Sequence, residues 1–243
     1  MLEAGLQRFL TINNWRAKPL FIKVGANDGL TGDPCGDRLL RHDRWVGHLI
    51  EPIPYIYSKL QSIYSDSSRF VCHQLAISHE AGKAQIYYVS PEAEYSLQEL
   101  PFYWDQLASF DRFHIERVLG QDIKPYILAC EVPVITLRDL VVKWNIKNIN
   151  FLHIDTEGHD LVVLKSLKIS PKLKPEAILV EIKNLSVLDK SILADYLLGV
   201  GYPFLFYGGN DLIAFSNNII GSCMIVYGWI VVIGSYLIGR KLH

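Results

Sequence analysis

Two short motifs in the first quarter of the chain carry the side chains best suited to binding a nucleoside. The first, FIKVGANDG, is an apolar run followed by a turn between Gly25 and Gly29. The second, HLIEP, ends another apolar run with the carboxylate of Glu51. Glycine lets a ligand approach the backbone, and a carboxylate accepts hydrogen bonds from ribose hydroxyls. The pair therefore predicts a nucleoside site; the alternative is an ordinary glycine turn followed by a solvated glutamate.

A third motif, NFLHIDTEGHD, places acids and histidines at the end of a predicted strand. Side chains alternate along an extended backbone, so His153, Asp155 and Glu157 would share one face and could bind a divalent cation. Alternatively, Asp155 meets a ligand while Glu157 lies in the first turn of the following helix, where acids are favoured. The sequence offers no second cluster of histidines and carboxylates to supply the remaining ligands, so we expect a site without a metal.

The spacing of apolar residues predicts the elements that position these motifs. Strands are expected at 20–24, 46–50, 70–76, 84–89, 150–155, 177–182, 203–207 and 211–215. Helices are expected at 2–17, 54–64, 136–144, 160–167 and 189–199. Because strands and helices alternate, the pattern predicts a doubly wound α/β domain, with a mostly parallel sheet and helices on both faces. Ligands of such folds bind at the carboxyl ends of the strands, where these motifs fall.

Residues 90–130 interrupt this alternation. They carry aromatic residues among polar ones, including Phe102, Trp104 and Phe110, together with His114. Such a stretch indicates an insertion or a lid over the site. The alternative is a surface helical hairpin whose aromatic side chains pack inward.

The C-terminal residues form a distinct apolar segment. Ile219–Ile238 is mostly apolar and is followed by Arg240 and Lys241. A helix of that length spans about 30 Å, the hydrocarbon thickness of a bilayer. We therefore expect residues 1–217 to form the folded domain and residues 218–243 to form a tail with a candidate transmembrane segment at 219–238. One or two buried strands are the alternative for this segment.

The composition narrows the class of protein. Half of the residues are hydrophobic and the formal net charge is −1, so no basic field predicts nucleic-acid binding. The four cysteines are scattered without a C-x-x-C pair, which argues against a zinc knuckle or a disulfide scaffold and predicts a reduced environment. The N-terminal residues lack the basic flank and long apolar core of a signal peptide. We expect a cytoplasmic domain, anchored to a membrane if the tail spans it.

Taken in order, the motifs VGANDG, IEP, LHIDTEGHDLVVLKSL and AILVEI resemble those of the FkbM family of S-adenosylmethionine-dependent methyltransferases. The resemblance covers residues 20–215, and the segment TLRDLVVKWNI also matches the family's pattern. One position departs from it, because many members carry Asp or Gln before VGAN, where this chain carries Lys23. An acidic contact from the first strand to the cofactor's amino group is then missing. Asp28 would supply it instead, or would cap the following helix.

The resemblance implies a Rossmann-like class I methyltransferase fold, with a seven-stranded, mostly parallel sheet that ends in a C-terminal antiparallel hairpin at 203–215. It implies S-adenosylmethionine as the cofactor, and a hydroxyl of a sugar, glycan or natural product as the acceptor. The residues implied to bind the cofactor are Gly25, Asn27, Asp28 and Gly29 at its methionine part, Glu51 with the adjacent Pro52 at the ribose, Gln74, Leu75 and Ala76 at the adenine, and Asp155 near the transferred methyl.

The catalytic groups implied by the resemblance are Asp155, Glu157 and His159. In-line methyl transfer requires the protein to align an acceptor oxygen and to remove its proton. Asp155 is expected to position the cofactor or the acceptor, and His159 or Glu157 to take the proton.

Two other functions stay open. One is an NAD-dependent oxidoreductase, although its G-x-G-x-x-G fingerprint has a glycine where this chain has Asn27. The other, which Lys23 favours, is a membrane-anchored binding module without activity.

Overall fold

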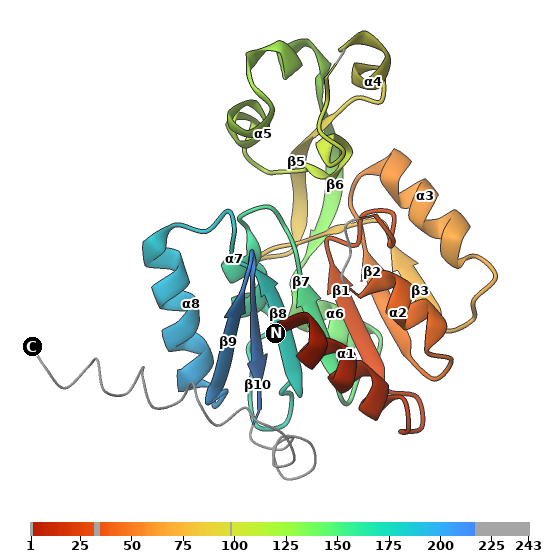
Figure 1. Ribbon diagram of the computed structural model, residues 1–243, viewed down its shortest axis with the longest axis vertical. Helices are drawn as coiled ribbons and strands as arrows, with labels where there is room; N and C mark the ends of the chain where they lie inside the picture. The colour runs from red at the N-terminus through yellow and green to blue at the C-terminus, as the bar shows by residue number, and fades with distance from the viewer. Residues whose placement is uncertain (1, 32–34, 98, 217–243) are drawn as a thin grey trace, which may run out of the picture.

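The computed structural model describes residues 2–31, 35–97 and 99–216 of the chain. A seven-stranded sheet runs through the middle of the molecule in the order β3-β2-β1-β7-β8-β10-β9 (Figure 1). Its strands are β1 (Leu20–Val24), β2 (Val46–Ile50), β3 (Phe70–His73), β7 (Phe151–Ile154), β8 (Ala177–Glu181), β9 (Phe204–Gly208) and β10 (Asp211–Phe215). Strand β10 is antiparallel to both of its neighbours, whereas the pairs among β3, β2, β1, β7 and β8 are parallel. The predicted doubly wound α/β fold with a closing antiparallel hairpin is confirmed.

Helices pack on both faces of this sheet. One face is covered by α1 (Leu2–Asn13), α2 (Gly36–Arg41) and α3 (Pro54–Tyr64), and the other by α6 (Leu137–Lys143), α7 (Asp160–Ser166) and α8 (Val187–Gly199). Because side chains alternate along each strand, each face has its own core. Phe21 and Phe151 belong to the first core, and Ile22 and Leu152 to the second. The ring of Phe9 in α1 packs onto the first core, with its centroid 5.8 Å from that of Phe151.

Local sequence signals set the starts of two helices that lead into or out of the site. Helix α3 begins with Pro54, which lacks the N–H group that a first helical residue leaves unpaired. Helix α6 begins with a capping box: the Thr136 hydroxyl accepts from the N–H of Asp139, and the Asp139 carboxylate accepts from the N–H of Thr136. The expected helix at 54–64 coincides with α3, and the expected helix at 136–144 corresponds closely to α6.

A second, three-stranded sheet leaves the carboxyl edge of the first and carries a small lobe (Figure 1). Its strands are β4 (Ala76–Ile77), β5 (Gly82–Val89) and β6 (Ile127–Ile135), in the order β4-β6-β5. Residues 90–126, here called the cap, contain α4 (Ala93–Ser96), the 3-10 helix η1 (Trp104–Gln106), α5 (Arg112–Leu119) and the 3-10 helix η2 (Gln121–Tyr126). Leu107 and Ile115 lie in the cap's own core, whereas Phe102 is exposed rather than packed inward.

Two strands differ from the sequence-based expectations, and helix α2 was not expected. Strand β6 was not expected, because its first residues fall in the predicted insertion at 90–130, and Glu131 and Pro133 interrupt its apolar run. The single strand expected at 70–76 is two strands. β3 pairs with β2 in the large sheet, and the chain then crosses over to pair β4 with β6. The crossover brings Ala76 and the residues after it toward the carboxyl edge of the large sheet.

In the part of the chain that the structure describes, no helix is both long and apolar enough to cross a membrane. The candidate transmembrane segment at 219–238 and the rest of the 218–243 tail lie outside the described residues. The predicted division of the chain at residue 217 stays a prediction.

Candidate active site

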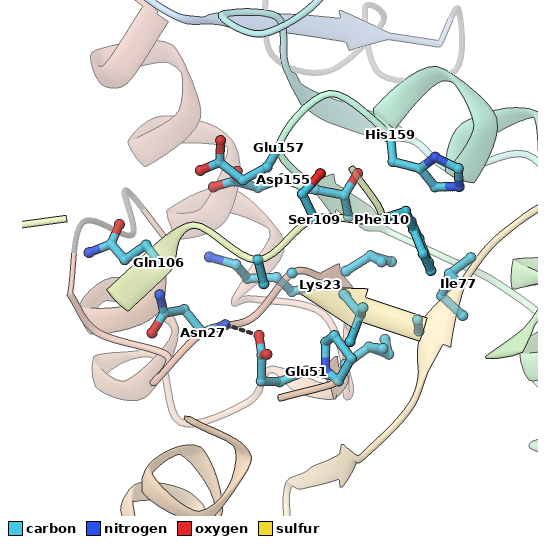
Figure 2. Close-up of a pocket in the computed structure, with 18 of the residues that line it drawn as sticks. Lys23, Asn27, Glu51, Ile77, Gln106, Ser109, Phe110, Asp155, Glu157 and His159 are labelled. Carbon is cyan, nitrogen blue, oxygen red and sulfur yellow. Dashed lines mark hydrogen bonds between the residues drawn. The ribbon is translucent and has the colours of Figure 1, made fainter. Parts of the chain in front are cut away.

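A pocket of about 770 Å³, partly open to solvent, lies at the carboxyl ends of β1, β2 and β7. Figure 2 shows side chains entering it from these strand ends and from the cap. Nine of the residues predicted for the site line it: Gly25, Asn27, Glu51, Pro52, Leu75, Ala76, Asp155, Glu157 and His159. The cap adds Gln106, Ala108, Ser109 and Phe110, which no sequence motif identified as site residues.

Three residues predicted to bind the cofactor lie outside the pocket lining. The Asp28 carboxylate accepts hydrogen bonds from the N–H groups of Leu30 and Thr31, so it stabilises the turn. Gly29 lies against α3, where a Cβ would come within 2.5 Å of the ring of Tyr64. Gln74 is exposed to solvent. Asp28 and Gly29 therefore shape the loop around the pocket rather than its inner surface.

Gly25 follows β1 and lies against the end of the neighbouring strand β7. Its φ is +77°, and a Cβ there would come within 1.7 Å of the carbonyl oxygen of Asp155. The Asp155 N–H in turn donates to the carbonyl of Val24. Glycine is required here because the β7 backbone passes directly against it, a reason that does not depend on a ligand.

Glu51 follows β2 and is buried, with 5% of its surface exposed. One carboxylate oxygen accepts from the N–H of Asn27 at 3.0 Å (Figure 2). The other accepts from the N–H of Ile53 at 2.9 Å. Burial raises the pKa of Glu51 to about 7, while these two hydrogen bonds and the charge of Lys23 act in the opposite direction. Each oxygen has two lone pairs, so the carboxylate keeps capacity to accept hydrogen bonds from a ligand.

Lys23 lies in β1 between Leu49 of β2 and His153 of β7 and is 3% exposed. Figure 2 shows its side chain directed into the pocket. Its positive charge acts on two carboxyl groups, those of the buried Glu51 and the half-buried Asp211, whose pKa values desolvation raises. The residue that departs from the family pattern therefore brings a cation into a pocket edged by carboxylates.

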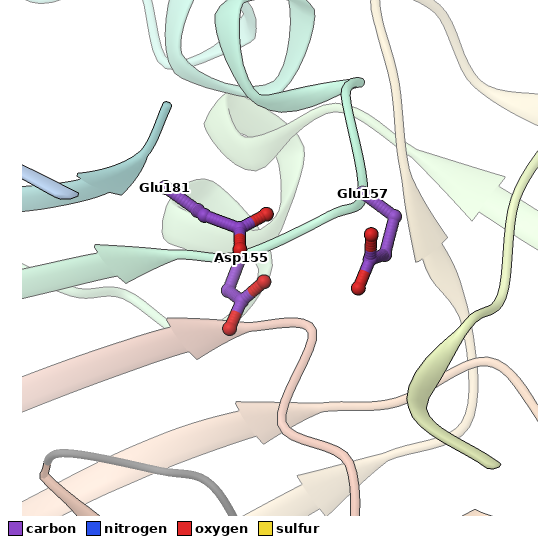
Figure 3. A group of neighbouring side chains, drawn as sticks. All are labelled: Asp155, Glu157 and Glu181. Atoms are coloured by element: carbon purple, nitrogen blue, oxygen red, sulfur yellow. The ribbon is translucent and has the colours of Figure 1, made fainter. Parts of the chain in front are cut away.

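Three carboxylates converge beside the pocket (Figure 3): Asp155, Glu157 and Glu181 have oxygens within 4.8 Å of one another. Burial raises the pKa of Glu181 well above its usual range, and the negative charges of Asp155 and Glu157 raise it further. His153 is not in this group, because β7 ends at Ile154 and the alternation of side chains stops there. Such oxygen ligands suit Mg²⁺, but acidic groups are also common without an ion.

Glu157 lies in a tight loop between β7 and α7. Its φ is +52°, in the left-handed region that favours glycine, and Gly158 follows at +96°. The buried carboxylate of Asp160 holds this loop by accepting from the N–H groups of Thr156 and Gly158. The sequence offers a signal for this loop. The last residue of the motif IDTEGHD is Asp160, the acid whose carboxylate accepts these two hydrogen bonds.

The Glu157 side chain is contacted from the cap and from the body of the domain. His114 of α5 places Nε2 3.2 Å from Glu157 Oε2, and the Asn184 side-chain amide donates to the same oxygen at 2.7 Å. Neither His114 nor Asn184 was predicted as a site residue, because neither belongs to a strand-end motif.

His159 lies on another side of the pocket. Its Nε2 is 3.0 Å from the hydroxyl oxygen of Ser78, and its ring centroid is 4.8 Å from that of Phe110. Figure 2 shows the ring directed away from Asp155 and Glu157. Burial lowers the pKa of His159, which favours the neutral imidazole. The structure thus separates His159 from the two acids with which it was grouped.

The strand order, the closing antiparallel hairpin and a pocket at the carboxyl ends together define a Rossmann-like methyltransferase fold. The chain belongs to the FkbM family, whose methyltransferase FkbM domain matches residues 23–204. Methyltransferases of this family and class use S-adenosylmethionine.

Solved structures resemble the chain at low sequence identity. The FkbM methyltransferase from Methylobacillus flagellatus is 15% identical, with a TM-score of 0.50 over 82% of this chain and 44% of its own. The METTL16 methyltransferase domain is 10% identical, with a TM-score of 0.47 over 88% and 65%. The fibrillarin pre-rRNA processing protein of Methanococcus jannaschii is 11% identical, with a TM-score of 0.41 over 83% and 67%. The chain spans less than two thirds of the first two, and no curated protein sequence matches it.

Proposed function

We propose that this protein transfers a methyl group from S-adenosylmethionine to a hydroxyl of a sugar, glycan or natural product. The observation that carries the proposal is the buried Glu51 carboxylate in the pocket, held by backbone N–H groups at the end of β2. A carboxylate fixed in this way is suited to accept hydrogen bonds from the two hydroxyls of a ribose.

The rest of the pocket supports the same cofactor. Ala76, Ile77 and Ile86 offer an apolar wall for the adenine ring beside Glu51. The ammonium group of Lys23 would pair with the carboxylate of the methionine part. When bound, S-adenosylmethionine supplies an activated methyl carbon that an acceptor oxygen attacks in line. The protein's own residues must then align the acceptor and hold the proton that leaves it.

The acceptor would enter between the cap and the carboxyl edge of the large sheet. Here Gln106 and Ser109 of the cap line the same pocket as Asp155 and Glu157, so polar groups are available from the cap and from the strand ends. Hydrogen-bonding groups from both parts suit a polyhydroxylated acceptor. The cap would act as the predicted lid, and the domain would work in the cytoplasm, on the membrane if the tail anchors it.

Calorimetry with S-adenosylhomocysteine tests the cofactor. We expect binding by the wild type, about tenfold or more weaker binding by Glu51→Gln, and unchanged binding by the matched surface variant Glu131→Gln, since losing one buried charged hydrogen-bond partner costs about 1.5–3 kcal/mol. Binding of NAD in place of S-adenosylhomocysteine would support the oxidoreductase alternative and overturn the proposal.

Release of S-adenosylhomocysteine from S-adenosylmethionine tests the reaction. A panel of methyl glycosides, oligosaccharides and lipid-linked sugars would serve as acceptors, with a no-acceptor control. Turnover that depends on a hydroxyl acceptor is the expected result. Cofactor binding without turnover of any hydroxyl acceptor would instead support the inactive binding module.

A further inference from the structure

The cap contacts the body of the domain at the Glu157 loop. The His114–Glu157 pair joins α5 to the loop after β7, and both side chains are largely buried, with 11% and 15% exposed. Nearby, the Lys183 ammonium group lies 5.2 Å from the centroid of the Tyr103 ring. These contacts place Glu157 at the junction of the two walls between which an acceptor would bind.

The hydrogen bonds at Glu157 leave one of its oxygens for a ligand. Among the residues that the structure describes, His114 and Asn184 both approach Oε2. Oε1 therefore keeps its lone pairs while the carboxylate is fixed in direction by donors from both walls. A carboxylate held in this way is suited to accept a proton from a hydroxyl placed beside Oε1.

The backbone at Glu157 also indicates a functional position. A non-glycine residue at φ +52° is held in an unfavourable conformation, at a cost of about 1–2 kcal/mol. The fully buried Asp160 carboxylate fixes the loop by bonding the residues on both sides of Glu157. A glycine would relieve the strain but would remove the carboxylate from the pocket.

The other candidate bases are less well placed. His159 shares its Nε2 with the Ser78 hydroxyl and lies against Phe110. Asp155 directly follows β7, and its carbonyl is packed against Gly25, so it lies deeper at the strand ends. Glu157 is the member of the acidic group that the cap contacts.

We propose that Glu157 accepts the proton of the acceptor hydroxyl, and that His114 of the cap and Asn184 of the body are positioning residues that aim its carboxylate. This inference rests on the proposed methyl transfer. The acceptor oxygen forms its bond to the methyl carbon, the carbon–sulfur bond breaks with its electron pair left on sulfur, and the hydroxyl proton moves to Glu157. Catalysis then requires that the cap stays packed against the body of the domain, with His114 in contact with Glu157.

A double-mutant cycle tests this arrangement with the best acceptor from the panel above. Glu157→Gln should lower kcat about 100-fold or more, as loss of a general base does, while S-adenosylhomocysteine binding changes less than about twofold. His114→Leu should lower kcat about tenfold, and His114→Gln, which keeps a donor, should stay within about threefold of the wild type. The matched control is His42→Gln, at a histidine that follows α2 and does not line the pocket.

The decisive result is the double variant. Because His114 acts through Glu157, adding His114→Leu to Glu157→Gln should cause no further loss of kcat. Independent, multiplicative losses would overturn the positioning role, and wild-type turnover by Glu157→Gln would overturn the assignment of the base. A wild type that binds S-adenosylhomocysteine but methylates no hydroxyl acceptor would instead overturn the proposed function.

Hydrogen–deuterium exchange supplies a readout that does not depend on turnover. In His114→Leu, amides of α5 should exchange about threefold faster or more than in the wild type, because α5 has lost its contact with the Glu157 loop. In His114→Gln the exchange should stay near the wild-type rate. Equal protection of α5 in all three proteins would show that this contact does not seat the cap, and would overturn the inference.

Discussion

The Cα of Gly25 and the carbonyl oxygen of Asp155 lie so close that no side chain fits between the ends of β1 and β7. Gly25→Ala should therefore destabilise the protein by about 3 kcal/mol or more, since its Cβ meets backbone and its φ is positive. Urea unfolding followed by circular dichroism measures this loss. Gly199→Ala, with no atom within 4 Å of the added Cβ, is the matched control and should be close to neutral. Equal stability of the two variants would contradict the close contact.

Lys23 should raise the affinity of the pocket for ligands that carry the methionine part of the cofactor. In Lys23→Met we expect S-adenosylhomocysteine to bind about tenfold more weakly, because a charge-assisted hydrogen bond to its carboxylate is lost. Adenosine lacks that carboxylate, so its affinity should fall much less than that of S-adenosylhomocysteine, and only because Glu51, proposed to hold the ribose, loses the neighbouring positive charge. The exposed variant Lys83→Met should bind both ligands normally. If Lys23→Met weakened both ligands equally, Lys23 would instead be acting on the shape of the pocket.

The crowded carboxylates should make the protein less stable in alkaline solution. Burial and the charges of Asp155 and Glu157 raise the pKa of Glu181 in the folded state. The group therefore contributes stability below its ordinary pKa, and this stability is lost as the pH rises toward the folded-state value. Glu181→Gln should be more stable than the wild type by about 2 kcal/mol near pH 8 and by little near pH 5.

Thermal or urea unfolding at both pH values checks the effect, with Glu131→Gln on the exposed edge of β6 as the control. A stabilisation of Glu181→Gln that is the same at both pH values would show that it does not come from titration.

A pair of buried histidines should have the opposite dependence on pH. His48 Nδ1 lies 2.9 Å from His73 Nε2, and both rings pack against Trp144. Burial, followed by the charges of His48 and Lys143, lowers the pKa of His73 to about 4. The neutral pair then stabilises the fold above a pH near 6.5, and this stability is lost as the pH falls toward 4.

Between about pH 7.5 and pH 5 the wild type should lose more unfolding free energy than His73→Gln, by about 1–2 kcal/mol after allowance for solvent screening. Other titrating groups are common to both proteins and cancel in this comparison. The control is His79→Gln, at an exposed histidine. The same pH dependence in the wild type and His73→Gln would show that the histidine pair is not the cause.

The large sheet was predictable from the sequence because each of its strands is specified by a short, continuous stretch of residues. Apolar runs such as the one before Gly25 mark strands, and turn residues or acids such as Glu51 mark their carboxyl ends. The order of the motifs then identified the family and its strand order. Parallel strands bring their carboxyl ends to one edge, which is why Asn27 and Asp155, far apart in the chain, line one pocket.

The cap's contribution was not predictable in this way. Phe110 and His114 reach the site because a long two-stranded ribbon, β5 and β6, projects from the sheet and folds their segment back over it. Nothing in their own sequence neighbourhood specifies that path. The left-handed backbone at Glu157 likewise depends on Asp160 and not on the propensity of a glutamate. This bend separates Glu157 from His159, whereas His153 is separated from the acids because β7 ends at Ile154.

The direction of the last strand sets where the described chain ends relative to the pocket. Strand β10 runs from Asp211, paired with Glu181 beside the pocket, to Phe215, paired with Ala177 at the opposite end of the sheet. The last described residue, Ser216, follows Phe215 directly. The entrance to the pocket therefore lies at the other end of the domain from the point where the described chain ends.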